Sequence, residues 1–342
     1  MIDPVRIGIV GAGAWARTTH APLLCDLPEA RLVAVASRSP ENRRALCEAS
    51  SASLRQYGDP DGLFADADVE AVLIATPNYT HEDLAVRALA AGKHLLCETA
   101  LSLTVDGYDR VAAAWRAAGT TLAVDLELRA SDVAQRLREL ILTGHIGLPR
   151  LISCLMLRDW GRFCDSGAEL ARCGGMFVEV GTHYLDLFNL LANDDPARVF
   201  ATGGDVLGIG HPDYLWTTVE YEGGVRASLG MSVFAAGQGK SALHVIGTEG
   251  CLEAEIISGQ VQLWRRGQAT PEDYSPARRG VPAPGLPGSR ELLQDFARCV
   301  RSGGVPIVDF EVARAATALA LAAARSYACG SPVVPSSREQ TA

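Results

Sequence analysis

A glycine-rich turn near the start of the chain has the spacing of a phosphate-binding loop. It reads Gly11-Ala12-Gly13-Ala14-Trp15-Ala16 and follows an apolar, β-branched stretch at residues 5–10. In such a turn the first glycine permits the tight bend, the second lets a pyrophosphate approach the backbone, and a small third residue lets helix and strand pack closely. The helix that follows adds N–H groups and partial positive charge. We therefore expect a dinucleotide on Gly11, Gly13, Ala14 and Trp15, with a purely structural turn as the alternative.

The end of the second expected strand discriminates between NAD and NADP. An Asp or Glu at this point would accept hydrogen bonds from the ribose hydroxyls and repel a 2′-phosphate. This chain has Ser37-Arg38 instead. A hydroxyl and a guanidinium suit a phosphate. The pair favours NADP over NAD, and a solvated surface arginine is the alternative for Arg38.

Two residues of the second half could move protons. Glu179 precedes His183 by four residues, so on a helix both face the same side. Histidine titrates near neutral pH, and general acid catalysis commonly contributes about 10²–10⁴ in rate. We predict that His183 is the acid/base group and that Glu179 orients it. A structural histidine is the alternative.

Polar and aromatic residues that could reach a substrate lie before and beside His183. Arg158, Trp160 and Arg162 follow an expected strand, and Tyr184 comes directly after His183. Such groups suit sugar-like or carboxylate-bearing ligands. We expect them to bind substrate, and an ordinary polar loop is the alternative for the first three.

Strands alternate with helices over the first 126 residues. The pattern predicts a parallel, doubly wound sheet, that is, an α/β fold of the Rossmann type. Ser39 is the expected N-cap of a helix that begins at Pro40. A single helix is expected over about Trp15–Leu24. The strands are expected at 5–10, 31–36, 69–76, 94–98 and 121–126.

After about residue 128 the pattern changes to longer strands joined by short turns. This is typical of an antiparallel or mixed sheet. The family resemblance given below implies an open, mostly antiparallel sheet in an α+β domain. One helix is expected inside it, at Met176–Leu191. The predicted domains are therefore residues 1–122 for NADP and 123–342 for substrate and oligomer contacts. The last helices are candidates for packing back on the first domain.

The composition bounds the class of protein. The length of 342 residues suits two domains, and the formal net charge is −9. An acidic chain without a basic cluster argues against nucleic acid and anionic membranes as partners. No signal peptide, membrane-spanning run or C-x-x-C pair is visible, so we expect a cytoplasmic protein with reduced thiols and no metal site.

Several segments together resemble the Gfo/Idh/MocA oxidoreductase family, which includes glucose–fructose oxidoreductase and inositol dehydrogenase. They are GAGAWA with THAPLL, ATPNYTHEDLAVRALAAGKHLLCET, the arginine of DLELR, GHIGLPRLI, GGMFVEVGTHYLD and VIGTEGCLEAE. The resemblance covers nearly the whole chain. It implies a nicotinamide-dependent oxidoreductase acting on sugars, inositols or other polyols, and a homo-oligomer, dimer or tetramer, formed through the second-domain sheet. Some relatives reduce imines in biosynthetic pathways.

The resemblance also implies positions around the nicotinamide. Thr76, Pro77, Asn78 and His81 are expected to flank its ribose, and Glu98 is expected beside the ring. His20 is expected only to pack at the end of the first helix. Asp125 and Glu127 replace more neutral residues and are candidates for an unusual pocket, without an assigned role.

One motif departs from the family pattern. The usual Glu-Lys-Pro reads Glu98-Thr99-Ala100, so Thr99 stands where a catalytic lysine is expected. Threonine can hydrogen-bond but cannot carry a positive charge. Three interpretations follow: an NADP(H)-dependent oxidoreductase with His183 as acid/base, an imine reductase whose protonated C=N needs no lysine, or a cofactor-binding protein with little turnover.

Overall fold

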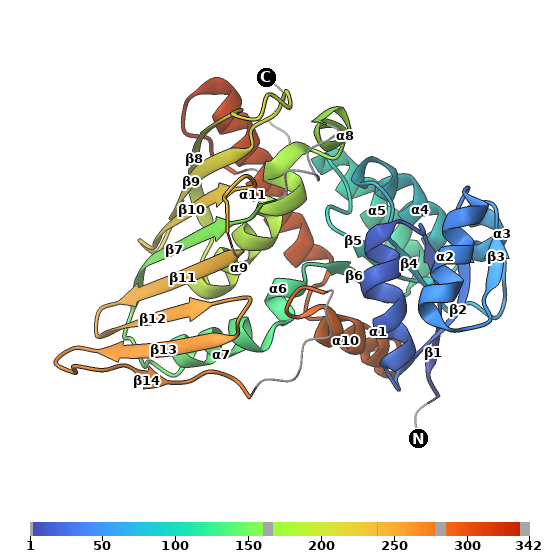
Figure 1. Cartoon of the computed structure of the whole chain (residues 1–342), viewed down its shortest axis with the longest axis horizontal. Helices are drawn as coiled ribbons and strands as arrows, with labels where there is room; N and C mark the ends of the chain where they lie inside the picture. Colours follow the sequence, from blue (N-terminus) through green and yellow to red (C-terminus); the bar gives the residue numbers. More distant parts are fainter. Residues whose placement is uncertain (1–2, 160–166, 238, 278–284, 336–342) are drawn as a thin grey trace. The chain divides into compact units, whose positions relative to one another are not determined.

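The computed structural model describes residues 3–159, 167–237, 239–277 and 285–335. The chain forms two compact units (Figure 1). Unit 1 comprises Met1–Glu127 and Val281–Arg314, and unit 2 comprises Leu128–Gly280 and Ala315–Ala342. The second break falls inside the final helix, α11 (Phe310–Cys329).

Unit 1 contains a six-stranded sheet in the order β3-β2-β1-β4-β5-β6, and every neighbouring pair is parallel. The order reverses direction between β1 and β4, which is the point where doubly wound sheets bind ligands at the carboxyl ends of their strands. The predicted parallel Rossmann sheet is confirmed. Its strands are β1 (Val5–Val10), β2 (Ala30–Ala36), β3 (Arg55–Tyr57), β4 (Ala71–Ile74), β5 (His94–Glu98) and β6 (Leu122–Asp125).

Helices join these strands, and local chemistry sets where they begin. The Ser39 side chain accepts from the backbone N–H of Asn42, with Pro40 at the first position, so the predicted N-cap is confirmed. The late helix α10 contacts β1 and β6. The helices of unit 1 are η1 (Ala16–His20), α1 (Ala21–Asp26), α2 (Pro40–Ser50), α3 (Pro60–Phe64), η2 (Asn78–Thr80), α4 (His81–Ala90), α5 (Val105–Ala118) and α10 (Ser289–Ser302).

The first helix differs from the single α-helix expected over Trp15–Leu24. It begins as a π-helix, η1, in which the backbone N–H of Ala21 donates to the carbonyl of Ala16. Pro22 explains the change in part, because it has no N–H to give the Thr18 carbonyl its α-helical bond. The wider turn ends at His20, which is buried.

Unit 2 contains an eight-stranded sheet in the order β14-β13-β12-β11-β7-β10-β9-β8. Only β7 and β10 pair in parallel among its recorded strand pairs. The expected open, mostly antiparallel sheet is confirmed. Its strands are β7 (Pro149–Leu157), β8 (Pro196–Gly204), β9 (Tyr214–Tyr221), β10 (Arg226–Ser232), β11 (Lys240–Gly247), β12 (Gly250–Glu255), β13 (Gln260–Arg265) and β14 (Glu272–Asp273).

The helices of unit 2 cover one side of this sheet. The helix expected at Met176–Leu191 begins as a π-helix, η3, and continues as α9, which contacts β7 and β10. The strands alternate buried and exposed residues, and large apolar side chains such as Leu155, Phe200 and Trp216 are exposed. The helices are α6 (Glu127–Ala130), α7 (Asp132–Leu142), α8 (Gly167–Arg172), η3 (Phe177–Gly181) and α9 (Thr182–Ala192).

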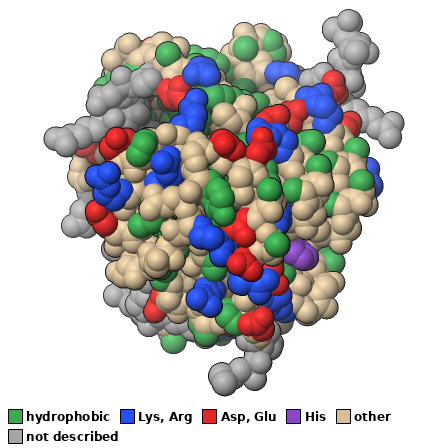
Figure 2. All heavy atoms as spheres, turned by 90° about the vertical axis from the view of Figure 1, so that its right-hand side faces the viewer, with side chains coloured by type: hydrophobic (Ala, Val, Ile, Leu, Met, Phe, Trp, Pro, Cys, Tyr) green, Lys and Arg blue, Asp and Glu red, His purple; other side chains and the backbone are tan. Residues whose placement is uncertain are grey.

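The surface carries charges of both signs. On the face drawn in Figure 2, Lys and Arg side chains lie among Asp and Glu side chains. Exposed ion pairs such as Arg87–Asp61 and Arg55–Asp68 belong to this pattern of mixed charge in unit 1. In the described part of the chain, no helix is both long and apolar enough to span a membrane.

Candidate active site

The glycine-rich turn lies between β1 and η1. Gly11 has φ +103°, and a Cβ there would lie 2.2 Å from the carbonyl oxygen of Ala75, so only glycine fits. Nothing lies within 4 Å of the place where a Cβ on Gly13 would stand. The turn is thus closed toward the end of β4 and open over Gly13, which suits the close approach of a dinucleotide phosphate.

The residues after β2 present positive charge. Arg38 is exposed, and no hydrogen bond or ion pair of its side chain is recorded among the described residues. Arg43, on the first turns of α2, donates to the backbone carbonyl of Ser37. Arg17, from η1, donates to Asn42 of the same helix at 2.8 Å. A phosphate at the Ser37-Arg38 turn would therefore find two or more guanidinium groups close by.

The loop after β4 is tied down by a buried histidine. His81 is fully buried, with Nε2 2.6 Å from the Thr76 carbonyl oxygen and Nδ1 2.9 Å from that of Ala100. Burial lowers the pKa of His81. Asn78 is also buried, while Pro77 is exposed. His81 joins the loops after β4 and β5, so it positions this edge through backbone carbonyls.

Glu98 lies at the carboxyl end of β5 and gathers donors from the first helix. The Trp15 indole N–H donates to Glu98 Oε1 at 2.7 Å, and His20 Nε2 lies 2.5 Å from the same oxygen. The glycine-rich turn is therefore connected to the expected nicotinamide position through Trp15. His20 was expected only to pack at a helix end, and sequence reasoning missed its contact with Glu98.

Two more carboxyl groups lie at the end of β6. Asp125 pairs in register with Glu98, and its Oδ2 lies 3.9 Å from His20 Nε2. Burial raises the pKa of the Asp125 carboxyl well above its usual range, and the negative charges of Glu98 and Glu127 raise it further. One side-chain nitrogen or oxygen atom from each of His20, Glu98 and Asp125 lies within 4.8 Å of the others, close enough to share an ion. However, Glu98 Oε1 and His20 Nε2 already use each other as partners.

Unit 1 supplies no lysine in place of the one that the motif lacks. The chain contains two lysines, Lys93 and Lys240. Lys93 Nζ donates to the carbonyls of Asp66 and Val69, ahead of β5 and at the opposite end of the strand from Glu98. Lys240 begins β11 in unit 2. Thr99 itself is buried, and its hydroxyl has no hydrogen-bond partner in the described part of the chain.

In unit 2, the predicted proton-moving residues lie on the helix pair η3–α9. Glu179 is inside the π-helix and His183 is in the first turn of α9, and both are half-buried. Pi-helical turns inside helices occur frequently at functional sites. Gly175 precedes them with φ +70°, and a Cβ there would meet the ring of His211 at 2.0 Å. His211 was not anticipated.

The structure brings two predicted substrate residues together. Arg158 donates to Ser241 Oγ at 3.0 Å, and the Tyr184 hydroxyl lies 2.8 Å from the same oxygen. Arg158 also donates to the carbonyls of Leu157 and Lys240. Ser241 was not anticipated. Trp160 and Arg162 lie outside the described residues.

Arg129, the arginine of the DLELR segment, forms a buried ion pair. Its guanidinium contacts both carboxylate oxygens of Asp186, at 2.6 to 3.1 Å. The side chains are 13% and 1% exposed. The bidentate geometry fixes α6 to α9 within unit 2.

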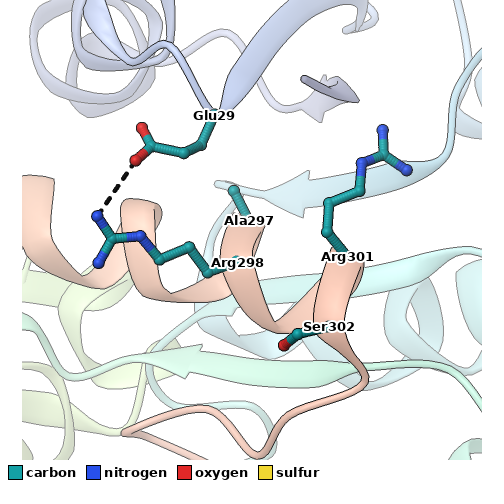
Figure 3. A pocket seen from close by; sticks show the side chains of 5 residues that line it. All are labelled: Glu29, Ala297, Arg298, Arg301 and Ser302. Atoms are coloured by element: carbon teal, nitrogen blue, oxygen red, sulfur yellow. Dashed lines mark hydrogen bonds and ion pairs between the residues drawn. The ribbon is translucent and has the colours of Figure 1, made fainter. Parts of the chain in front are cut away.

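A cavity of about 300 Å³ lies elsewhere in unit 1. Figure 3 shows its lining, with Arg298 of α10 donating to Glu29. Glu29 precedes β2, so this cavity adjoins the amino end of the strand. Ligands of doubly wound sheets bind at the carboxyl ends. The cavity is therefore not the dinucleotide site.

The fold and this edge of the sheet define a dinucleotide-binding Rossmann protein with a second, α+β unit. A model of the oxidoreductase family with an NAD-binding Rossmann fold matches residues 5–126, and a model of the GFO/IDH/MocA C-terminal domain matches residues 134–253. The chain belongs to the Gfo/Idh/MocA oxidoreductase family.

Individual proteins agree with this assignment. An uncharacterised oxidoreductase of Rhizobium meliloti is 30% identical over 68% of this chain and 69% of its own length. An inositol 2-dehydrogenase of the same species is 29% identical over 73% of this chain and 76% of its own. A crystal structure provisionally assigned as an NADPH-dependent oxidoreductase of Desulfitobacterium hafniense has a TM-score of 0.86 at 23% identity, covering 98% of both chains. The last shows the fold alone.

Proposed function

We propose that this oxidoreductase uses NADP(H) and acts on a small polar, sugar-like metabolite. The cofactor choice rests on the residues after β2, where Arg38 is exposed and Arg43 donates a hydrogen bond to the Ser37 carbonyl. No carboxylate stands at Ser37-Arg38 to repel a 2′-phosphate. The inositol dehydrogenase relative supports the substrate class.

The bound cofactor would supply or accept a hydride, and the protein has to manage the accompanying proton. We assign that proton to His183, because unit 1 has no lysine beside Glu98 and because histidine titrates near neutral pH. Glu179 is the candidate for orienting His183. The Arg158, Tyr184 and Ser241 group of unit 2 is the candidate for binding substrate hydroxyls.

Replacing Arg38 tests the cofactor choice. Arg38→Ala should weaken NADP⁺ binding about 10–100-fold and leave NAD⁺ binding within about twofold, since a charge-assisted hydrogen bond contributes about 1.5–3 kcal/mol. Calorimetric titration measures both affinities. Arg44→Ala is the matched control, because Arg44 is an exposed arginine of α2, the helix that begins just after Arg38. Equal losses for both cofactors, or none for either, would reject the 2′-phosphate site.

A substrate panel separates the alternatives. NADPH oxidation with ketoses or other carbonyl sugars supports the proposal, and turnover with cyclic imines alone would favour an imine reductase. Tight cofactor binding without turnover on any of them would favour a cofactor-binding protein. The exposed apolar side of the unit 2 sheet is the surface through which we propose that copies associate. A monomer mass by light scattering would reject that association.

A further inference from the structure

Four polar side chains of unit 1 meet where β5 and β6 end. Glu98 and Asp125 are the last residues of the two strands and are register partners. His20 Nε2 lies 2.5 Å from Glu98 Oε1 and 3.9 Å from Asp125 Oδ2. Glu127 follows Asp125 by two residues and hydrogen-bonds to its carboxyl group. We call these four residues the carboxyl cluster.

The cluster is shielded from water to different degrees. The side chains of His20, Asp125 and Glu98 are 1%, 4% and 16% exposed. Asp125 Oδ1 and His20 Nδ1 are buried without a hydrogen-bond partner in the described part of the chain. Adjacent buried carboxylates cannot all ionise at low cost, because each charge loses hydration and repels the next. Glu98 is the member through which the cluster can exchange protons with water.

The titratable neighbours on adjoining segments do not compensate this charge. Cys97 precedes Glu98, and burial together with Glu98 and Asp125 raises the pKa of its thiol well above the usual value, so it stays neutral. His81 of α4 is fully buried, and burial lowers the pKa of its imidazole. Neither group adds positive charge at neutral pH. A proton on Asp125, whose carboxyl has its pKa raised by burial and by the charges of Glu98 and Glu127, reduces the repulsion.

We propose that the carboxyl cluster stores one proton and releases it when the oxidised nicotinamide cofactor binds. The inference rests on the proposed function and on the expected position of the nicotinamide beside Glu98. The oxidised ring carries a positive charge and the reduced ring is neutral, so only the oxidised form favours another negative charge in the cluster. On release the O–H bond of Asp125 breaks, its electron pair stays on the carboxylate, and the proton reaches the buffer through Glu98. Nothing is oxidised or reduced in this binding step.

The proposal has a thermodynamic consequence. If NADP⁺ binding releases one proton, its affinity rises about tenfold per pH unit below the apparent pKa of the cluster. NADPH releases no proton, so its affinity changes little over the same range. The cluster thus makes the balance between the two cofactor forms depend on pH.

Counting protons tests the proposal directly. NADP⁺ and NADPH are titrated into the full-length protein in Pipes and in Tris at one pH. The difference in apparent binding enthalpy between buffers of different ionisation enthalpy gives the number of protons exchanged. We expect release of about one proton with NADP⁺ and about none with NADPH. Equal release with the two cofactors would overturn the proposal, and this comparison needs no variant.

Two variants localise the proton. Asp125→Asn, nearly isosteric, should lower the release with NADP⁺ to the level seen with NADPH. Glu70→Gln is the control, because Arg301 holds the pKa of Glu70 at about 2 and the group carries no proton to release. Wild-type release from Asp125→Asn would overturn the assignment. Release of the same proton by Mn²⁺ alone would also overturn it, since the cluster would then be a cation site.

If neither cofactor binds, the proposed function fails, and this inference fails with it. If both bind with equal proton exchange, the proposed function stands and only the inference fails.

Discussion

The buried charges of the two units are compensated in different ways. In unit 2, the most buried carboxylate–guanidinium contact is bidentate, between Asp186 and Arg129. In unit 1, Asp125 lies near His20 and two further carboxyl groups, those of Glu98 and Glu127. One buried oxygen of Asp125 has no hydrogen-bond partner in the described part of the chain. Asp186 is compensated by a guanidinium, whereas no guanidinium or ammonium group of the described part of unit 1 pairs with Asp125, and we propose a stored proton there.

The two kinds of compensation have different consequences for structure and for function. A bidentate arginine fixes a carboxylate in one state and one position. A proton can leave and return, so the carboxyl cluster can respond to a ligand. The comparison predicts that changes in unit 2 at Arg129 act on stability, whereas changes in the carboxyl cluster act on proton binding. His183 is the exception to be tested in unit 2, because it is proposed to carry a proton there.

The largest expected effect is on turnover at His183. His183→Ala should lower kcat by about 10²–10⁴, because the variant lacks the group that exchanges the substrate proton. NADP⁺ affinity should stay within about threefold, and the limb of the kcat–pH profile that a histidine produces should disappear. Stopped-flow and steady-state assays with the substrate found in the panel measure these quantities.

His244→Ala is the matched control for this experiment. His244 is a partly exposed histidine of β11 in the same unit, and it should be replaceable with no change in kcat. Wild-type turnover by His183→Ala would show that the histidine is structural. It would also remove the proton-exchanging group assigned to unit 2.

Breaking the Arg129–Asp186 pair should have the next largest effect. Arg129→Ala leaves Asp186 buried without its guanidinium, and loss of one partner of a buried pair commonly costs about 3–5 kcal/mol. Urea unfolding measures the change in free energy. Arg136→Ala provides the comparison, since Arg136 pairs with Glu139 on an exposed helix face and such pairs contribute about 0–1 kcal/mol. A small loss at Arg129 would mean that Asp186 is compensated by other groups.

The sequence predicted the parts of the site that depend on local pattern. The turn at Gly11–Ala16 and the N-cap at Ser39 each follow from a few adjacent residues, and both the Rossmann sheet and the antiparallel sheet follow from strand spacing. The same spacing predicted one continuous helix at Trp15–Leu24 in unit 1 and another at Met176–Leu191 in unit 2. Instead, π-helical segments occur at Ala16–His20 and Phe177–Gly181.

The carboxyl cluster could not be assembled from the sequence because it joins three segments that are far apart along the chain. His20 is 78 residues from Glu98, and the two meet only after a π-turn aims the imidazole inward. Asp125 and Glu127 were noticed as unusual, but their spacing carries no information about burial. The two signals that could have indicated the cluster are register between the ends of β5 and β6 and the absence of a nearby lysine. Ser241 was missed for the same reason, since it meets Tyr184 from a distant strand.

The smallest expected effect is on the pH dependence of stability in the Asp125→Asn variant. The folded-state pKa of Asp125 lies above its unfolded value, so its protonation stabilises the fold at low pH and this contribution is lost as pH rises toward the folded pKa. Asparagine cannot ionise. Asp125→Asn should therefore match wild type near pH 4 and become more stable than wild type by about 1–3 kcal/mol at pH 8.

Glu70 gives the opposite sign in the same unit. Hydrogen bonds and charge from Arg301 hold its pKa at about 2, below the unfolded value, so its contribution is present at neutral pH and lost as pH falls toward 2. Glu70→Gln should therefore be less stable than wild type at pH 7 and approach it in acid. Urea unfolding of the three proteins from pH 2 to pH 8 measures how each difference in stability changes with pH. The stability of Asp125→Asn relative to wild type could change with pH in the same direction as that of Glu70→Gln. Asp125 would then be ionised and compensated in the folded protein, and the carboxyl cluster would resemble the Arg129–Asp186 pair after all.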